Sequence, residues 1–513
     1  MKPTIPQQLQ AEKQKIEDRL EQARRGMAPL GEGAEFTTER IHFELSSRTH
    51  AISHGGIGVM HNLVQSLGLP NLIDEWLVLL KQYRPYHESD HVLNITYNIL
   101  CGGRTLDDIE LLRNDNNYLD ALGARAIPDP TTAGDFCRRF SSEDVWTLMQ
   151  IINDVRVGVW RKRGPELLEQ TARIDADGTI VETTGECMQG MDMSFKGTWG
   201  YHPLLVSLAN TGEPLFLINR SGNQTSNAGA AEVFDEAIAL CRRAGFADVL
   251  LRGDTAFSMT ANFDRWTDDG VRFVFGYIAA PSLKTRAEGL PEHEFEVLVR
   301  KAELALAQDK LRRAKQPRVK EAIVEQRGYR NIRLESEDLA EFEHKPARAK
   351  KTYRMVVLRK NLVEEQGQLC LGNEVRYFFY VTNDETLTVE EVVAEANGRC
   401  NQENLIAQLK GGVRSLHSPL NTLEANWAYM VMASLAWSLK AWFALLLPSS
   451  PSPLCQELHD HEREKVLRMD FRTFLLNFMQ VPAQILRTGR RLVVRFLAWR
   501  RSLDILFRAI VAY

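Results

Sequence analysis

The spacing of apolar residues along the chain changes near residue 171. Before that point, GIGVMHNLVQSLG, NLIDEWLVLLKQY and HVLNITYNILCGG repeat apolar residues at helical spacing, which predicts a helical region over residues 51–165. A polar segment over residues 5–26 predicts a helix within a separate N-terminal arm, residues 1–50. From residue 171 onward, apolar residues alternate with polar ones or form short runs, which is typical of strands.

Residues 166–281 predict a core of alternating strands and helices. TARIDADGTIVET reads as a strand, and HPLLVSLANTGEPLFLINRSG as two strands joined at Asn210–Gly212. The helix AAEVFDEAIALCRRAG, the strand ADVLLRGDTAF, the helix MTANFDRWTDDG and the strand VRFVFGYIA follow. The order βββαβαβ predicts an α/β core with three antiparallel strands followed by two parallel ones, which is the ribonuclease-H-like arrangement.

This pattern is interrupted over residues 282–375. FEVLVRK, NIRLES, YRMVVLRK and VRYFFYVTN read as strands, with a charged helical stretch between the first two, so we expect a mostly β, basic insertion. Helical spacing resumes at residue 388, and residues 376–440 are expected to complete the core. Residues 441–513 are expected to be helical.

Composition narrows the class of protein. Hydrophobic residues make up 44% of the chain and charged residues 25%, a balance typical of soluble globular proteins. The apolar stretch from Tyr429 to Pro448 contains Lys440 and is expected to be a buried core helix, so no membrane partner is predicted. None of the seven cysteines forms a Cys-x-x-Cys pair, which indicates reduced thiols, a cytoplasmic location and no structural zinc.

Positive charge is concentrated locally although the net charge is −4. Residues 310–360 hold 16 Lys and Arg against 7 Asp and Glu, a local +9, and residues 461–513 hold 11 against 4, a local +7. Such patches suit the gripping of phosphates, although a solvated surface without a partner explains them equally well. Arg138 and Arg139, on a short predicted helix, are further candidates for DNA contact.

Three carboxylates are candidates for metal chemistry. Asp177 lies on the first core strand, Asp254 closes the fourth strand, and Glu403 lies on a later helix. Singly, each has an ordinary explanation as a turn residue, a helix cap or a surface ion pair. Brought together they would repel one another and would stay ionised only with cations between them. Hard oxygen ligands with open positions suit two Mg²⁺ or Mn²⁺ ions, which can activate water or a 3′-hydroxyl in phosphodiester attack.

One basic residue precedes the last acid in sequence and another follows it. Arg399 precedes Glu403 by four residues and Lys410 follows it by seven, so all three are expected on one face of a single helix. A cation one turn from the acid and another two turns away can hold phosphates beside a metal site.

With these motifs the chain resembles the DDE transposases of bacterial insertion sequences, in the branch with a large β insertion before the final acid. Asp254–Phe257 matches the Asp-x-[Gly/Ala]-[Tyr/Phe] motif of that branch, and Asp177–Thr179 matches the surroundings of its first acid. Arg399, Glu403 and Lys410 match its Tyr-x2-Arg-x3-Glu-x6-Lys motif. The resemblance covers about residues 50–440 and includes the stretch GTWGYHPLLVSLANTGEPL.

Two positions leave this assignment open. The Tyr of the third motif is replaced by Ala396. Asp175 lies two residues before Asp177, on the same face of the predicted strand, and is an alternative first ligand. His202 is a further rim candidate, although a structural role is the more ordinary explanation.

The resemblance implies a metal-dependent transposase that binds the terminal inverted repeats of its element, cleaves the 3′ ends and joins them to target DNA. It implies a homodimer, since two ends must be joined, and insertion aromatics that stack on a displaced base. Gly55–Gly58 lacks the Lys-Ser/Thr of a phosphate-binding loop, so no nucleotide cofactor is expected. The alternatives are a structure-specific endonuclease on the same fold and a transposase retired to DNA binding.

Overall fold

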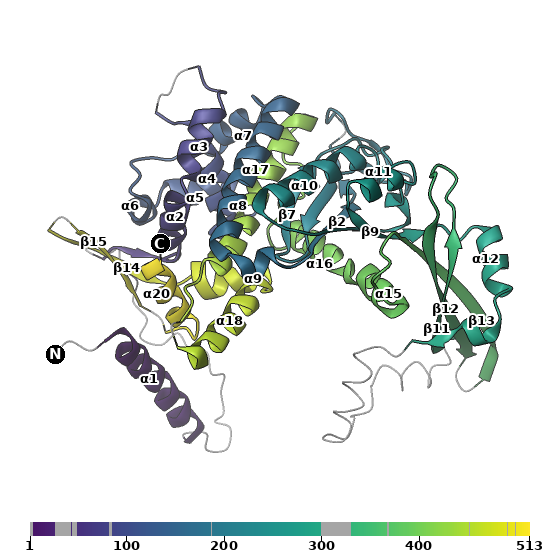
Figure 1. Ribbon diagram of the computed structural model, residues 1–513. Helices are drawn as coiled ribbons and strands as arrows, with labels where there is room; N and C mark the ends of the chain where they lie inside the picture. The colour runs from purple at the N-terminus through teal and green to yellow at the C-terminus, as the bar shows by residue number, and fades with distance from the viewer. Residues whose placement is uncertain are drawn as a thin grey trace.

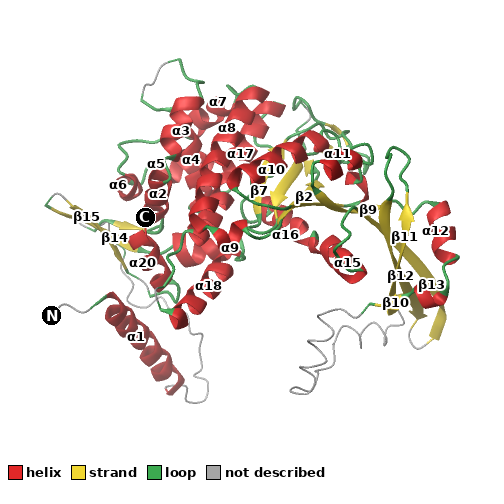
Figure 2. Cartoon of the chain, viewed as in Figure 1, coloured by secondary structure: helices red, strands yellow, loops and turns green. Residues whose placement is uncertain are grey.

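The computed structural model describes residues 4–25, 43, 49–81, 85–185, 187–298, 330–366, 369–450, 452–489, 491–497 and 499–512. Helices gather around one long central helix, and a twisted sheet extends from this helical body to the far end of the molecule (Figure 1). The colouring by secondary structure separates the two regions clearly (Figure 2). The charged helix expected between the first two insertion strands lies outside the described residues.

The helical body is built around α17 (Leu423–Leu445), every residue of which from Ala425 onward is buried. This helix is long and apolar enough to cross a membrane, but its apolar stretch is wholly enclosed by the fold, as the prediction of a core helix required. The N-terminal helices surround it: α2 (Ile57–Ser66), α3 (Leu69–Trp76), α4 (Glu88–Leu100), α5 (Ile109–Arg113), α6 (Asn116–Leu122), α7 (Pro130–Cys137), α8 (Ser142–Arg163) and α9 (Pro165–Leu168). The expected arm helix is α1 (Ile5–Arg25).

Buried polar groups join the helical body to the sheet. Glu213 is fully buried at the start of β7 and accepts hydrogen bonds from Arg156 at 3.0 Å, Trp160 at 2.8 Å and Trp442 at 2.7 Å. These donors come from α8 and α17, so one carboxylate connects two helices and a strand. A buried charge is tolerated only when it is paired and hydrogen-bonded in this way.

The nine-stranded sheet has the order β10-β11-β12-β13-β9-β8-β2-β6-β7. In its core part β2 pairs with β6, and β6 with β7, in antiparallel fashion, while β2, β8 and β9 are parallel. These directions agree with the arrangement expected from the sequence. The core elements are β2 (Ala172–Gly178), β6 (Leu204–Leu208), β7 (Glu213–Ile218), α10 (Ala230–Ala244), β8 (Val249–Gly253), α11 (Phe263–Asp268) and β9 (Arg272–Tyr277).

The inserted strands continue the core sheet. After α12 (Pro281–Glu288) and the short β10 (Glu296–Val297), three long antiparallel strands follow: β11 (Arg330–His344), β12 (Tyr353–Gln366) and β13 (Leu369–Thr382). β13 pairs with β9 of the core through Phe379–Thr382. The expected boundary between residues 375 and 376 therefore runs through the middle of β13, because this strand belongs to the insertion and the core sheet at once.

The expectation of a wholly helical region over residues 441–513 is wrong. Helices α18 (Pro453–Leu467), α19 (Phe471–Phe474) and α20 (Leu503–Ala512) are present, but a hairpin of β14 (Ala483–Thr488) and β15 (Arg491–Phe496) lies between them. β14 also pairs with β1 (Ala51–Ile52), close to the start of the helical body. This strand partner lies more than 400 residues away in sequence, and its pairing adds to the stability of the hairpin.

Candidate active site

Two of the predicted acids stand side by side at one edge of the core sheet. In the parallel register of β2 and β8, Asp175 lies opposite Arg252. Two residues further along both strands, the same register leads to Asp177 and Asp254. The sequence thus placed both acids correctly, one on a strand and one directly after a strand. The carboxyl ends of parallel strands are where α/β sheets bind their ligands.

Asp254 also has the capping role that its sequence context suggested. Its Oδ1 accepts a hydrogen bond from the backbone N–H of Ala256 at 2.8 Å and begins the short turn Thr255–Phe257. The cap fixes the direction of the carboxylate, which is compatible with a second role in the site.

Glu403 lies on a helix that is shorter than the one predicted from the sequence. The expected single helix is two helices, α15 (Val389–Gly398) and α16 (Cys400–Lys410), with Arg399 at the junction. The break falls where α15 passes over Arg252, since a Cβ at Gly398 would lie 2.6 Å from its Nη1. The prediction of one continuous helix from residue 388 is corrected accordingly, while Arg399 caps the helix that carries both Glu403 and Lys410.

Both cations of the third motif nevertheless lie near the first acid, one at Asp177 itself and the other at the segment that follows its strand. Arg399 Nη1 lies 3.9 Å from Asp177 Oδ2. Lys410 Nζ donates a hydrogen bond to the backbone oxygen of Ile180 at 2.8 Å, three residues beyond Asp177. The junction and the end of α16 therefore place one positive charge on each side of Glu403.

Electrostatics connect the three acids. The pKa of Asp177 is raised to about 6, first by burial and then by the negative charge of Asp254, with a smaller contribution from Glu403. Arg399 and the backbone N–H of Gly178 act in the opposite direction. Because the cations present do not compensate the burial and the neighbouring carboxylates, the site favours an additional positive charge.

Arg138 and Arg139 lie elsewhere. Arg138 caps the end of α7, where it forms an ion pair with Asp135 at 2.7 Å and donates to Asn421 Oδ1 at 3.3 Å. Arg139 is exposed beside it. The contact with Asn421 joins Arg138 to the segment between α16 and α17, and the partners of Arg138 do not include any of the three acids.

A network of buried ion pairs behind the acids escaped the sequence reasoning. Arg252 binds both oxygens of Asp175, at 2.7 and 2.8 Å, and its Nη1 binds Glu395 of α15 at 2.9 Å. Glu395 also pairs with Arg173 of β2 at 2.6 Å. The network therefore joins the two strands that carry Asp177 and Asp254 to the helix that leads to Glu403. An arginine within the apolar run VLLRG was the available signal, because a charge in a buried strand requires partners.

Asp175 is occupied by this network. Its side chain is buried and both of its oxygens are held by Arg252. The carboxylate of Asp177 lies 3.9 Å from Arg399 and is affected by the charge of Asp254, and neither of its oxygens is held by Arg252, which favours Asp177 as the first acid.

A second residue missed by the sequence analysis attaches α16 to the sheet. Gln402, the neighbour of Glu403, is buried and donates from Nε2 to the backbone oxygen of Leu205 at 3.1 Å, while its Oε1 accepts from Ser207. Leu205 is the strand partner of Asp177. Gln402 thereby sets the position of α16 relative to the first acid.

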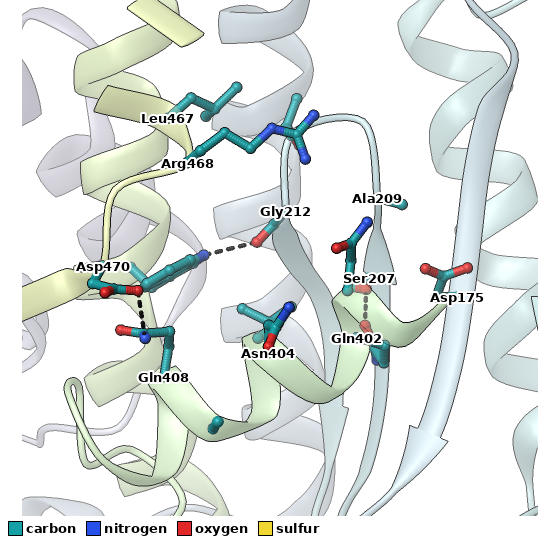
Figure 3. Close-up of a pocket in the computed structure, with 15 residues that line it drawn as sticks. Asp175, Ser207, Ala209, Gly212, Gln402, Asn404, Gln408, Leu467, Arg468 and Asp470 are labelled. Carbon is teal, nitrogen blue, oxygen red and sulfur yellow. Dashed lines mark hydrogen bonds between the residues drawn. The ribbon is translucent and has the colours of Figure 1, made fainter. Parts of the chain in front are cut away.

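A cavity of about 340 Å³ lies along α16 (Figure 3). The pair Gln402–Ser207 stands at one end of it, and at the other Gln408 donates to Asp470 at 2.9 Å (Figure 3). None of the three candidate acids lines this cavity. Polar contacts at the edges of this cavity hold both ends of α16. We therefore interpret the cavity as part of the contact between α16 and the rest of the fold.

Among the residues that the structure describes, no three His, Cys, Asp or Glu side chains are arranged to hold a metal ion, so Asp177, Asp254 and Glu403 are not brought together as a three-ligand site. The paired acids Asp177 and Asp254 nevertheless suit a divalent cation, because their mutual repulsion is relieved when a cation lies between them. Glu403 is exposed on α16 and stands open to the same region. His202 is a structural residue, buried with Nδ1 held 2.8 Å from the backbone oxygen of Gln224.

Comparisons with known proteins show which family the chain resembles in sequence and a solved structure to which it is similar. The sequence profile described as "Transposase DDE domain group 1" matches residues 45–512. Among solved structures, the chain is similar to a piggyBac transposase in a synaptic complex with hairpin DNA, at 10% identity over 82% of this chain and 86% of that one, with a TM-score of 0.33. No curated protein matches the sequence at a significant level.

Proposed function

The chain belongs to the family of DDE transposase domains, group 1, and from this premise we propose that it carries out cut-and-paste transposition of DNA. It would bind the terminal inverted repeats of its own element, hydrolyse the phosphodiester bond at each 3′ end, and join the freed 3′-hydroxyls to target DNA. The observation that supports this best is the position of Asp177 and Asp254 at neighbouring parallel strands, where the charges of Asp254 and Glu403 act on Asp177 and Arg399 lies 3.9 Å from it.

Each residue has a place in the proposal. Asp177, Asp254 and Glu403 would hold two Mg²⁺ or Mn²⁺ ions on a ribonuclease-H-like core. When bound, such ions supply Lewis acidity for the attacking oxygen and for the leaving one. Arg399 and Lys410 would hold the phosphates of the cleaved strand. Arg138 and Arg139 would contact DNA farther from the reaction.

We propose that the active form is a homodimer, since two transposon ends are cut and inserted together. The basic strands of the insertion would contact the DNA end. Lys345, Arg348, Lys350 and Lys351 lie in or near the turn between β11 and β12, and their charge suits a phosphate backbone.

Cleavage assays on the DNA that flanks the gene test the proposal. We expect the wild-type protein with Mg²⁺ to nick the ends of an imperfect inverted repeat and to insert them into a target plasmid. Asp254→Asn should bind the same DNA with unchanged affinity and leave it uncut, because the acid acts in the reaction and not in the recognition of the end. Asp269→Asn, an exposed acid after α11, is the matched control and should cut normally.

The products decide between the proposal and its rivals. Nicked ends without insertion into the plasmid would identify an endonuclease. Repeat binding that is unaffected by Mg²⁺, with intact DNA throughout, would identify a retired transposase. Full cleavage by Asp254→Asn would remove this acid from the site.

A further inference from the structure

A tight turn beside the acids carries exposed aromatic and cationic side chains. It joins β4 (Asp192–Met193) to β5 (Trp199–Tyr201) in a small sheet that also contains β3 (Val181–Glu182). The N–H of Gly197 donates to the backbone oxygen of Ser194 at 2.9 Å, and Gly197 adopts a φ of 74°, which favours glycine. Phe195 and Lys196 occupy the two corners of the turn.

The apolar side chains on this sheet face solvent. Phe195 is 79% exposed, Trp199 49% and Met193 46%. Met193 and Trp199 are direct partners across the two strands, so they share one face of the ribbon. Three large apolar side chains exposed together are not needed by the core, and such a patch indicates a binding surface.

Positive charge accompanies these side chains. Lys196 Nζ lies 5.5 Å from the centre of the Phe195 ring. After burial, the charge of Lys196 is the main cause that lowers the pKa of Lys410, and it also contributes to the lowered pKa of His202. The turn is therefore within electrostatic range of the cation that borders Asp177.

The small sheet is held firmly to the strand of the first acid. β3 begins three residues after the end of β2, and Ile180 between them accepts the hydrogen bond of Lys410. The Tyr201 hydroxyl donates to the backbone oxygen of Gln189 at 2.7 Å, and Asn223 donates to the carboxylate of Asp192 at 2.5 Å. These contacts connect the turn to the segment that directly follows the strand of Asp177.

Resting on the proposed function, we propose that Phe195, Lys196 and Trp199 form a platform for unpaired DNA next to the cleaved phosphate. The two rings would stack on bases, and the lysine would contact a phosphate of the same strand. Aromatic faces with a nearby cation suit single-stranded nucleic acid, because every base offers a π face. In contrast, Tyr353 of the insertion is buried and donates its hydroxyl to Asp264 at 2.7 Å, so its ring serves packing.

The test compares two short DNAs of equal sequence in the absence of divalent metal. One is a full duplex, and the other ends in a few unpaired nucleotides that include 2-aminopurine. We expect wild-type protein to bind the splayed DNA more tightly and to quench its fluorescence. Phe195→Ala and Trp199→Ala should each reduce the preference for splayed DNA about tenfold, since each removes one stacking ring. Trp76→Ala, at an exposed tryptophan of α3, should leave the preference unchanged.

Lys196→Gln should act differently. It should weaken the binding of both DNAs and lower the salt dependence of affinity by about one counterion, because it removes one phosphate contact. Unchanged preference and quenching in the Phe195→Ala, Trp199→Ala double variant would overturn the platform. Since binding is measured without metal, it is separate from the cleavage assay: wild-type protein that cuts DNA while the double variant binds normally refutes the platform alone, and wild-type protein that never cuts refutes the proposed function.

Discussion

Asp175 and Arg252 form a bidentate ion pair, at 2.7 and 2.8 Å, that connects β2 with β8. Asp177 lies near the end of the first of these strands, and Asp254 directly follows the second. The pair lies two residues before Asp177 on β2 and two residues before Asp254 on β8. Both side chains are buried. We interpret this ion pair as the element that sets the separation of the two acids.

Arg252→Met should therefore destabilise the fold by about 3–5 kcal/mol, since it leaves Asp175 as an unpaired buried charge. Urea unfolding would measure this loss. The double variant Asp175→Leu, Arg252→Met should recover most of the stability, because neither charge then remains. If the double variant is as unstable as the sum of the single ones, Asp175 and Arg252 act independently and the pair does not stabilise the strands.

Gln402→Ala tests the attachment of α16. The variant loses the hydrogen bonds to Leu205 and Ser207 but keeps Glu403, so we expect cleavage to slow by about tenfold to a hundredfold through misplacement of the acid. DNA binding should be preserved. Asn404→Ala, two residues along the same helix and exposed, is the control and should cleave at the normal rate. Equal rates in both variants would show that Gln402 does not position the acid.

The strands of the core could be predicted because each one shows its own local pattern. Alternation over TARIDADG and the apolar run ADVLLRG placed Asp177 and Asp254 on the correct elements. The contact at the break could not be predicted, because the side chain that lies against Gly398 is Arg252, which comes from a different strand. Residues 388–410 alone have the spacing of one continuous helix.

The hairpin β14–β15 shows the opposite case, in which a local signal was present. Short apolar runs in QILRTGRRLVVRF lie on either side of Gly489, which turns the chain with a φ of 59°. The pairing of β14 with β1 and of β13 with β9 depends on contacts between distant segments. The identity of the site's supporting residues, Arg252 and Gln402, likewise depends on which elements meet in the fold.

Removal of the charge of Glu213, which lies at the start of β7 and not among the acids, should lower the stability of the fold. Glu213→Gln removes the charge that compensates Arg156, which is itself buried, so we expect a loss of about 3–5 kcal/mol. Thermal or urea unfolding would show the change. Glu232→Gln, at an exposed acid in the first turn of α10, should alter stability by no more than about 1 kcal/mol. A loss as large at Glu232 as at Glu213 would contradict the special role of the buried pair.

The raised pKa of Asp177 leads us to expect that the stability of the fold depends on pH, and it fixes the direction of that dependence. The fold raises this pKa from 3.8 to about 6, so it favours the protonated acid, and ionisation lowers stability as pH rises between these values. Without metal, Asp177→Asn should therefore be more stable than wild type above pH 6, by an amount on the order of 2–3 kcal/mol. The difference should shrink as pH falls through 6 and vanish near 4. Unfolding measured across this range would test it.

Divalent metal should reverse the order of stability of wild type and Asp177→Asn above pH 6. Above pH 6 the ionised Asp177 is available to a cation, so Mn²⁺ or Mg²⁺ should stabilise wild type and have little effect on Asp177→Asn. Below pH 6 the same ions should bind weakly and release protons when they do, which titration calorimetry in two buffers would detect. Asp269→Asn, at an exposed acid after α11, is the control: its response to metal should remain that of wild type. A metal response lost in Asp175→Asn and kept in Asp177→Asn would exchange the roles of the two acids.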